Sequence, residues 1–260
     1  MDNPLTDYPL LDHRYDEPRN PQSRPPLTSC DGRALPPRFL MSFMGDILER
    51  HVRQNGCECM AICHSETRDF PLYRTNAGGT EVGLVQAPVG APAAVIMADL
   101  LIASGVEALV ACGGCGVLYP ISSGIILVPT AALRDEGTSL CYCAPSRDIS
   151  LDRNAVEAAC HLLDDRGIPY RTCKTWTTDG FFRETPALVE RRKAEGCDAV
   201  DMECAALAAV SRHYGARFAH LLYSGDSLAD PARHDGREWL ENTDARSIAF
   251  NAALALASIL

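Results

Sequence analysis

The stretch APAAVIMADLLIASGVEALVACGGCG, residues 91–116, carries the local pattern that decides the fold. Its first part, residues 91–105, is typical of a buried helix, because Pro92 lies in the first turn and Gly105 follows the last apolar residue. Residues 106–113 form a short apolar run that indicates a buried strand leading into a glycine-rich loop. A helix followed at once by a buried strand is the repeating unit of an α/β sheet.

The same alternation continues along the chain. Further strands are expected at residues 81–89, 123–130, 168–179 and 216–226, further helices at 152–167 and 243–260, and a strand end passing into an alanine-rich helix over 199–215. This order predicts a single α/β domain over residues 39–260, in which helices flank a central mixed β-sheet. Residues 1–38 hold eight of the 17 prolines, so we expect a proline-rich N-terminal arm there.

The composition excludes several classes of function. A net charge of -10 disfavours nucleic acid and anionic membrane surfaces as partners. We find no apolar run long enough to span a membrane and no signal peptide at the start, so we expect a cytoplasmic protein. The 12 cysteines are then expected to be reduced thiols.

Two cysteine-rich stretches allow other interpretations. Cys112 and Cys115 form a Cys-x-x-Cys pair, which suits a redox couple, glycine-directed packing, or a loop whose backbone N–H groups approach a ligand. The ligand loop is favoured, because glycines fill the gap between the two cysteines. The stretch CECMAICH, residues 57–64, contains zinc-type ligands, but it reads as a strand and lacks a second ligand pair. We therefore expect no metal site.

Acidic residues stand at the ends of two other expected strands. Asp201 and Glu203 flank Met202 at a strand-to-helix junction, where a carboxylate either offsets the helix dipole or binds the paired hydroxyls of a sugar. Asp226 ends an apolar strand and is either a general acid or a helix cap. Ligands of α/β sheets bind at the carboxyl ends of strands, so both acids are candidate site residues.

An aromatic pair follows a further expected strand, in TWTTDGFFRET, residues 175–185. Phe181 and Phe182 lie there beside Arg183 and Glu184. Aromatic rings next to charged groups suit a flat heterocycle, and they equally suit the edge of a core with a surface ion pair.

In this order, these stretches resemble the nucleoside phosphorylase/nucleosidase family, which includes uridine phosphorylase, hexameric purine nucleoside phosphorylase and methylthioadenosine nucleosidase. The most specific match is AVDMECAALAAVSRHYG, residues 199–215, which looks like the family's Glu-Met-Glu segment and alanine-rich helix. Residues 79–118, PTAALRDEGTS and TWTTDGFFRE look like other family segments. The resemblance covers about residues 39–260. It implies that phosphate cleaves the N-glycosidic bond of a uridine or purine nucleoside, giving ribose 1-phosphate and free base.

The resemblance also implies roles for single residues. Glu203 would bind the ribose hydroxyls and Met202 would line the sugar. Phe181 and Arg183 would lie at the base. Asp226 would protonate the leaving base, so Asp226 and Glu203 are the implied catalytic residues.

The phosphate ligands implied by the resemblance are Gly45, Arg50, Arg68, Gly113 and Gly114. Arg68 falls where the family places an arginine that reaches the phosphate of a neighbouring subunit. This implies a homo-oligomer, a hexamer or a dimer, with active sites shared between subunits. No cofactor is implied beyond inorganic phosphate as the co-substrate.

The chain departs from the family pattern at this phosphate site. GDILER lacks the family's proline and brings Arg50 one place late, while Ala111 and Gly114 replace an expected arginine and a Thr or Ser. Thr185 and Ala187 stand where uridine-specific members carry Gln and Arg. Two alternatives therefore stay open: a hydrolytic nucleosidase that uses water, and a nucleoside-binding protein without turnover.

Overall fold

The computed structural model describes residues 27–230, 233–237 and 241–260. The strands are β1 (Arg38–Ser42), β2 (Glu58–Cys63), β3 (Phe70–Ala77), β4 (Thr80–Gln86), β5 (Ala108–Val117), β6 (Ile126–Asp135), β7 (Asp148–Ser150), β8 (Tyr170–Thr178), β9 (Ala199–Asp201), β10 (Arg217–Asp230) and β11 (Arg233–Asp235). The helices are α1 (Gly45–Asn55), α2 (Ala91–Ala103), η3 (a 3-10 turn, Thr138–Cys141), α3 (Arg153–Asp165), α4 (Pro186–Ala194), α5 (Cys204–Tyr214) and α6 (Thr243–Ile259).

The strands form one 11-stranded mixed sheet in the order β11-β10-β6-β8-β9-β5-β1-β4-β3-β2, with β7 paired to β6. Because β10 also pairs with β5, the strands β5, β9, β8, β6 and β10 close into a ring. Strand β1 runs parallel to β4 and β5, and β5 runs parallel to β10, so their carboxyl ends share one edge. The predicted fold class, a single α/β domain with a central mixed sheet flanked by helices, is confirmed.

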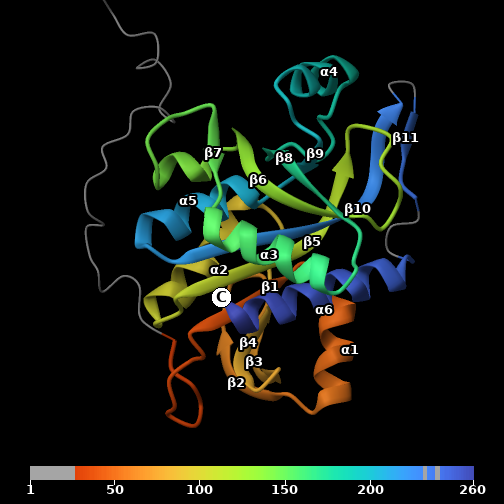
Figure 1. Ribbon diagram of the computed structural model, residues 1–260. Coiled ribbons are helices and arrows are strands. Elements are labelled where there is room, and N and C mark those ends of the chain that lie inside the picture. Colours follow the sequence, from red (N-terminus) through yellow and green to blue (C-terminus); the bar gives the residue numbers. More distant parts are fainter. Residues whose placement is uncertain (1–26, 231–232, 238–240) are drawn as a thin grey trace, which may run out of the picture.

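Helix α5 lies deepest, since every residue from Cys204 to Ser211 is buried. Its neighbour α2 packs against it, and α6 packs against β5, β1 and α1. Figure 1 shows α6 beside α1 in the lower part of the view and α4 standing apart at the top. Local signals set the helix ends: α1 ends at Gly56 in the left-handed region, and the Asp152 carboxylate caps the first turn of α3.

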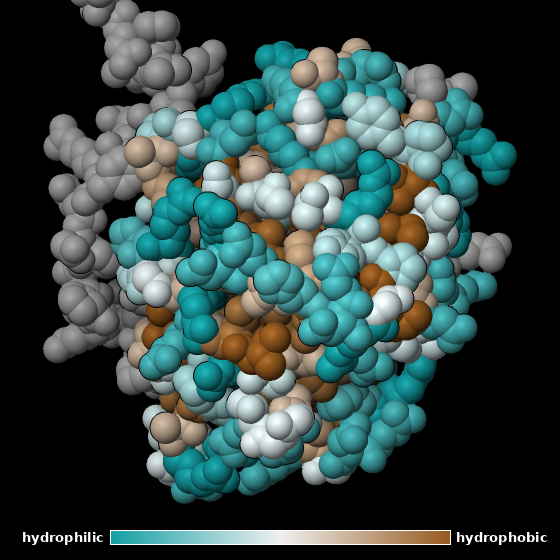
Figure 2. Space-filling model, in the orientation of Figure 1, coloured by the Kyte–Doolittle hydropathy of each residue, from teal (hydrophilic) through white to brown (hydrophobic). Residues whose placement is uncertain are grey.

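The expected arm over residues 1–38 lies mostly outside the described residues. Residues 27–37 follow the body of the domain: the Cys30 N–H donates to the Met60 carbonyl at 2.6 Å, and the Leu27 N–H donates to Ser104 Oγ at 2.7 Å. No helix of the described chain is long and apolar enough to cross a membrane. The face drawn in Figure 2 is largely hydrophilic, with hydrophobic residues in separate patches.

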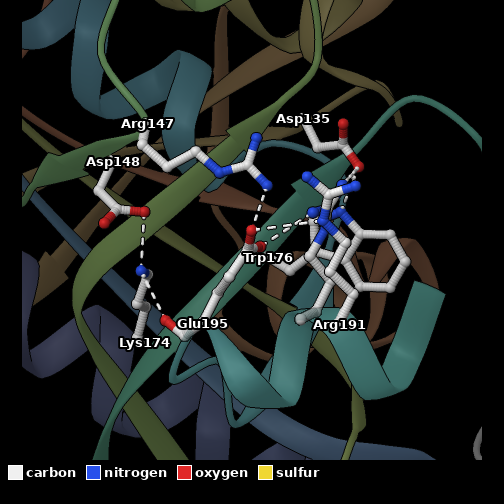
Figure 3. A network of polar contacts seen from close by, with 8 residues as sticks. Asp135, Arg147, Asp148, Lys174, Trp176, Arg191 and Glu195 are labelled. Atoms are coloured by element: carbon white, nitrogen blue, oxygen red, sulfur yellow. Dashed lines mark hydrogen bonds and ion pairs between the residues drawn. The ribbon is translucent and has the colours of Figure 1, made fainter. Parts of the chain in front are cut away.

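Helix α4 is fixed to the sheet by a network of charged groups, shown in Figure 3. The buried Arg192 donates to Asp135 Oδ2 at 2.6 Å and to Glu195 Oε2 at 2.9 Å, and its guanidinium lies 5.3 Å from the centre of the Trp176 ring. The Trp176 indole N–H donates to the same Asp135 oxygen at 2.8 Å. The network therefore fixes the C-terminal end of α4 to the sheet.

Replacing Arg192 by alanine should lower the free energy of unfolding by about 2–4 kcal/mol, because Asp135 would lose a buried cationic partner. The matched control is Arg191→Ala, since the exposed Arg191 lies 3.6 Å from Glu195 and such surface pairs contribute less than about 1 kcal/mol. Chemical denaturation of both variants measures the difference. Equal effects of the two substitutions would contradict a structural role for the network.

Candidate active site

The glycine stretch at residues 111–116 is part of strand β5, so the expected glycine-rich loop is wrong. Gly116 pairs with Val200 of β9 on one side and with Asp226 of β10 on the other. A Cβ atom at Gly116 would lie 2.6 Å from Leu228 Cδ1 and 2.9 Å from Val200 Cγ1, so a larger residue would have to displace these side chains where the ring of strands closes. Gly113 is buried against the Phe43 ring, whereas Gly114 is exposed.

The structure argues against the redox interpretation of Cys112 and Cys115. Residues three apart on a strand point to opposite faces and lie about 10 Å apart, which is too far for a disulfide. Burial also raises the pKa of both thiols. All 12 cysteines of the chain are free.

Asp201 holds together the junction between β9 and α5. Its Oδ1 accepts the hydroxyls of Thr175 at 3.0 Å and Thr177 at 2.8 Å, and its Oδ2 accepts the backbone N–H groups of Glu203 at 2.8 Å and Cys204 at 2.6 Å. These four donors occupy the acceptor positions of the carboxylate. Asp201 therefore plays the structural role that the sequence left open for this pair of acids.

Glu203 has a different environment, although it is only two residues away. The Gly90 N–H, just before α2, donates to its Oε1 at 2.6 Å, and the side chain is 6% exposed. Burial, followed by the nearby Asp201 carboxylate, raises the pKa of Glu203 to about 8. Because four donors stabilise the Asp201 carboxylate, Glu203 rather than Asp201 holds a proton at neutral pH. Met202, half-buried, lies between the two acids in the chain.

Asp226 owes its position to an irregularity in β10. The pairing of β10 with β5 shifts by one residue between Ser224 and Asp226, which is a β-bulge at Gly225. Strand β10 then continues to Asp230, so the turn expected after residue 226 comes later. The Asp226 carboxylate lies on the sheet two strands from Val200, a separation of about 10 Å.

Two residues that the sequence did not assign gather around Asp226. His234 of β11 places its Nε2 2.7 Å from Asp226 Oδ2. Glu184 lines the same open cavity of about 200 Å³ as His234, with Arg233 and Asp230. Burial and then the Asp226 charge raise the pKa of Glu184 to about 7, while His234 opposes the shift. Of these two residues, only Glu184 could have been suspected from the sequence, because it closely follows the aromatic pair.

The aromatic pair itself is exposed in the single chain. Phe181 is 56% exposed and Phe182 is 92% exposed, and their rings meet edge to face at 4.8 Å. Arg183 is exposed beside them. Their predicted contact with a base stays a prediction.

The expected phosphate ligands are partly brought together. A Cβ atom at Gly45, the first residue of α1, would lie 2.6 Å from Gln86 Nε2, and Arg68 donates to Gln86 Oε1 at 3.1 Å. Arg68 thus reaches the N-terminal end of α1 in its own chain, near the carboxyl end of β4. Arg50 leaves α1 about 140° around the helix from Gly45, on a different face.

One cluster has the residue types of a metal site. Within the described part of the chain, Asp201, Cys204 and His220 place one ligand atom each within 4.8 Å of one another. His220 is 1% exposed, neither ring nitrogen has a hydrogen-bond partner, and burial lowers its pKa to about 3. However, the four donors on Asp201 leave its carboxylate no free lone pair for a metal. The zinc-type ligands of residues 57–64 form no such cluster in the described structure.

Comparison with known proteins gives a consistent result. The family model described as "Phosphorylase superfamily" matches residues 38–260. The chain is 26% identical to guanosine phosphorylase of Halorubrum lacusprofundi over 154 residues, which are 59% of this chain and 64% of that protein. It is 25% identical to a DeoD-type purine nucleoside phosphorylase of Jannaschia sp. over 198 residues, 75% of this chain and 85% of that protein. The match to guanosine phosphorylase spans less than two thirds of that protein's length.

Solved structures share the fold. Uridine phosphorylase from Vibrio fischeri superposes with a TM-score of 0.71 at 21% identity, covering 86% of this chain and 92% of that one. AMP nucleosidase from Bacteroides thetaiotaomicron superposes with a TM-score of 0.69 at 21% identity, covering 86% of this chain and 88% of that one. Phosphorylases and a nucleosidase thus share this architecture, so the fold does not decide which nucleophile is used.

Proposed function

This chain belongs to the phosphorylase superfamily, and we propose that it is a nucleoside phosphorylase acting on a purine or uridine nucleoside. The observation that carries the proposal is the placement of Glu203 and Asp226 on either side of strand β5. Asp226 pairs with Gly116 on one side of that strand, and Val200, three residues before Glu203, pairs with Gly116 on the other side. A nucleoside laid over the glycines of that strand would have its ribose at Glu203 and its base at Asp226.

Each group then has a chemical task. Glu203, between the start of α2 and the start of α5, accepts or donates hydrogen bonds to the ribose hydroxyls, and Met202 packs on the sugar. Positive charge grows on the sugar and negative charge on the base as the glycosidic bond breaks, so Asp226 delivers a proton to the leaving base. Phe181 and Arg183 border the base in this proposal.

Phosphate is the proposed nucleophile because two cationic features meet at the start of α1. The first-turn N–H groups of a helix attract an anion. Arg68 lies beside this turn, because it donates a hydrogen bond to Gln86, whose side chain lies next to Gly45. The acidic Asp46 in the same turn is neutralised by the buried Arg246 of α6. Backbone N–H groups at Gly113 and Gly114 would complete the site in place of the absent side chains.

Water is the second candidate nucleophile. Ala111 and Gly114 contribute no anion-binding side chain at the end of the sheet where phosphate would sit. A hydrolytic nucleosidase would need only the ribose and base contacts proposed above. A binding protein without turnover needs no nucleophile at all.

The experiment is cleavage of a nucleoside panel with and without phosphate, followed by detection of free base and sugar 1-phosphate. We expect sugar 1-phosphate in stoichiometric amounts with the base, and release that requires phosphate. Base release that is indifferent to phosphate would establish the hydrolase instead, and binding without base release would establish the third alternative.

Arg68→Ala should raise the KM for phosphate by about tenfold or more, because one charge-assisted contact is worth about 1.5–3 kcal/mol. The matched control is Arg171→Ala, an exposed arginine of β8. Steady-state kinetics at varied phosphate measure both. An unchanged KM for phosphate in Arg68→Ala would remove Arg68 from the site.

A homo-oligomer, a hexamer or a dimer, is part of the proposal. Its support is the exposure of large apolar side chains, among them Ile62, Val89, Ile96, Phe181 and Phe182. In such an assembly a neighbouring subunit would cover the Phe181 pair. Arg68 would then serve its own phosphate site or a neighbour's, and mixing Arg68→Ala with Glu203→Gln subunits distinguishes the two.

A further inference from the structure

The proposed function does not give the source of the proton that Asp226 delivers, and the exposed His234 lies next to Asp226. A general acid must hold a proton at working pH, whereas an isolated aspartate carboxyl is ionised at neutral pH. His234 Nε2 lies 2.7 Å from Asp226 Oδ2, and the imidazole is the side chain whose ordinary pKa lies nearest neutrality. A protonated His234 can therefore pass a proton to Asp226 across a single hydrogen bond.

The fold builds this pair from two separate features. The bulge at Gly225 sets Asp226, and β11 pairs back antiparallel on β10, with Asp235 opposite Ser227. This register brings His234 over the Asp226 carboxylate. The His234 side chain is 58% exposed while the Asp226 side chain is 27% exposed, so the histidine exchanges protons with solvent and the acid faces inward.

Other charged groups surround the pair of Asp226 and His234. Glu184 comes to the same place from the segment before α4, and the Asp226 charge contributes to the raised pKa of its carboxyl. The other charged groups on the elements packed around the pair are Asp201, Asp230, Arg233, Asp235 and Arg237. Acids therefore outnumber bases around the pair.

We propose that His234 is a positioning residue that supplies Asp226 with the proton given to the leaving base, which assigns a purine nucleoside as the substrate class. This inference rests on the proposed function and extends it. Phosphate oxygen bonds to C1′ as the C1′–N9 bond breaks, and the bonding electron pair passes to the base. The Asp226 proton goes to N7 of the purine, the His234 imidazolium passes its proton to Asp226, and solvent reprotonates His234.

A purine is the class that this arrangement serves, because N7 is a second ring nitrogen that accepts the proton while N9 leaves. A uracil base leaves through N1 and takes its charge on carbonyl oxygens, where hydrogen-bond donors suffice. Glu184, whose pKa is raised to about 7, adds a further donor at the same wall when it is protonated.

The test compares His234→Ala and His234→Gln with the unchanged enzyme on guanosine across pH 5–9. We expect kcat/KM at pH 7 to fall by about 10–100-fold, within the range that general acid catalysis contributes. The ratio of unchanged enzyme to variant should shrink as pH falls, because solvent then protonates the lone carboxyl. His161→Ala, an exposed histidine of α3, is the matched control and should leave the profile unchanged.

A second substrate separates proton supply from simple damage. In 7-methylguanosine the base is already cationic at N7, so its departure needs no proton. We expect the His234 variants to keep nearly the full rate on this substrate while losing the rate on guanosine.

Two results would overturn the inference while leaving the proposed function in place. One is a His234 variant whose loss is the same at every pH, or which shows no loss. The other is an unchanged enzyme that cleaves uridine and no purine nucleoside. Failure of the unchanged enzyme to release base from any nucleoside would instead reject the proposed function itself.

Discussion

Asp201→Ala should lower the free energy of unfolding by about 3–5 kcal/mol, the largest stability loss we expect from a single substitution near the site. The carboxylate accepts four hydrogen bonds in a buried position, from two threonine hydroxyls and from the N–H groups of Glu203 and Cys204. Alanine would leave all four donors without this acceptor. Chemical denaturation of the purified variant measures the loss.

The asparagine variant sharpens this test. Asp201→Asn keeps one oxygen for the two backbone N–H groups, and its amide can donate to Thr175 and Thr177 after their hydroxyls rotate. We therefore expect Asp201→Asn to cost less than Asp201→Ala, about 1–2 kcal/mol. Asp165→Ala, at an exposed position of α3, is the control. If Asp201→Ala were as stable as that control, the carboxylate would not be organising the junction.

Glu203→Gln should lower kcat/KM by about 10²–10³-fold, the usual effect of removing one charge-stabilising contact from an active site. Glutamine retains the acceptor for the Gly90 N–H, so the fold should be preserved. It cannot become ionised, and so it cannot strengthen its hydrogen bonds to the ribose hydroxyls as charge develops. Steady-state cleavage of the best nucleoside substrate measures the loss.

The same variant should gain stability at high pH. The pKa of Glu203 is raised from 4.5 to about 8 in the folded chain, so the folded state holds this proton more tightly than the unfolded state does. The contribution of Glu203 to stability is then full below pH 4.5 and is lost as pH rises through about 8. Glutamine does not titrate, so Glu203→Gln should be about 1–3 kcal/mol more stable than the unchanged chain at pH 8.5 and nearly equal at pH 5.

Glu190→Gln, in the exposed part of α4, is the matched control for both readouts. Wild-type turnover in Glu203→Gln would refute the ribose assignment. A variant that loses turnover and stability together at every pH would show that Glu203, like Asp201, is a structural residue.

Much of the fold was predictable because its signals are local. The helix at residues 91–105 and the helix at 243–260 were expected close to the observed α2 and α6. Pro92 and Gly105 bracket α2 through backbone preferences that act within one turn. Family membership could also be predicted from the sequence, because the Asp-Met-Glu segment lies in one continuous stretch before α5.

The glycine stretch shows where local reasoning fails. A run of glycines in one sequence suggests a loop, but Gly116 lies between Val200 and Asp226, which are 84 and 110 residues further along the chain. Only the assembled sheet shows that a Cβ atom there would collide with Leu228 and Val200. The strand persists because both neighbours satisfy its backbone groups.

By itself, the sequence determined the α/β class, the approximate positions of α2, α3 and α6, and the presence of two acids beside Met202. Only the tertiary structure decided which acid does what, because burial and hydrogen-bond donors come from distant segments. Thr175 and Thr177 of β8 make Asp201 structural, whereas the Gly90 N–H and the Asp201 charge set the proton on Glu203. In the same way, β11 brings His234 to Asp226. A residue type fixes what a side chain can do, and the charges and donors that folding gathers around it decide which of those things it does.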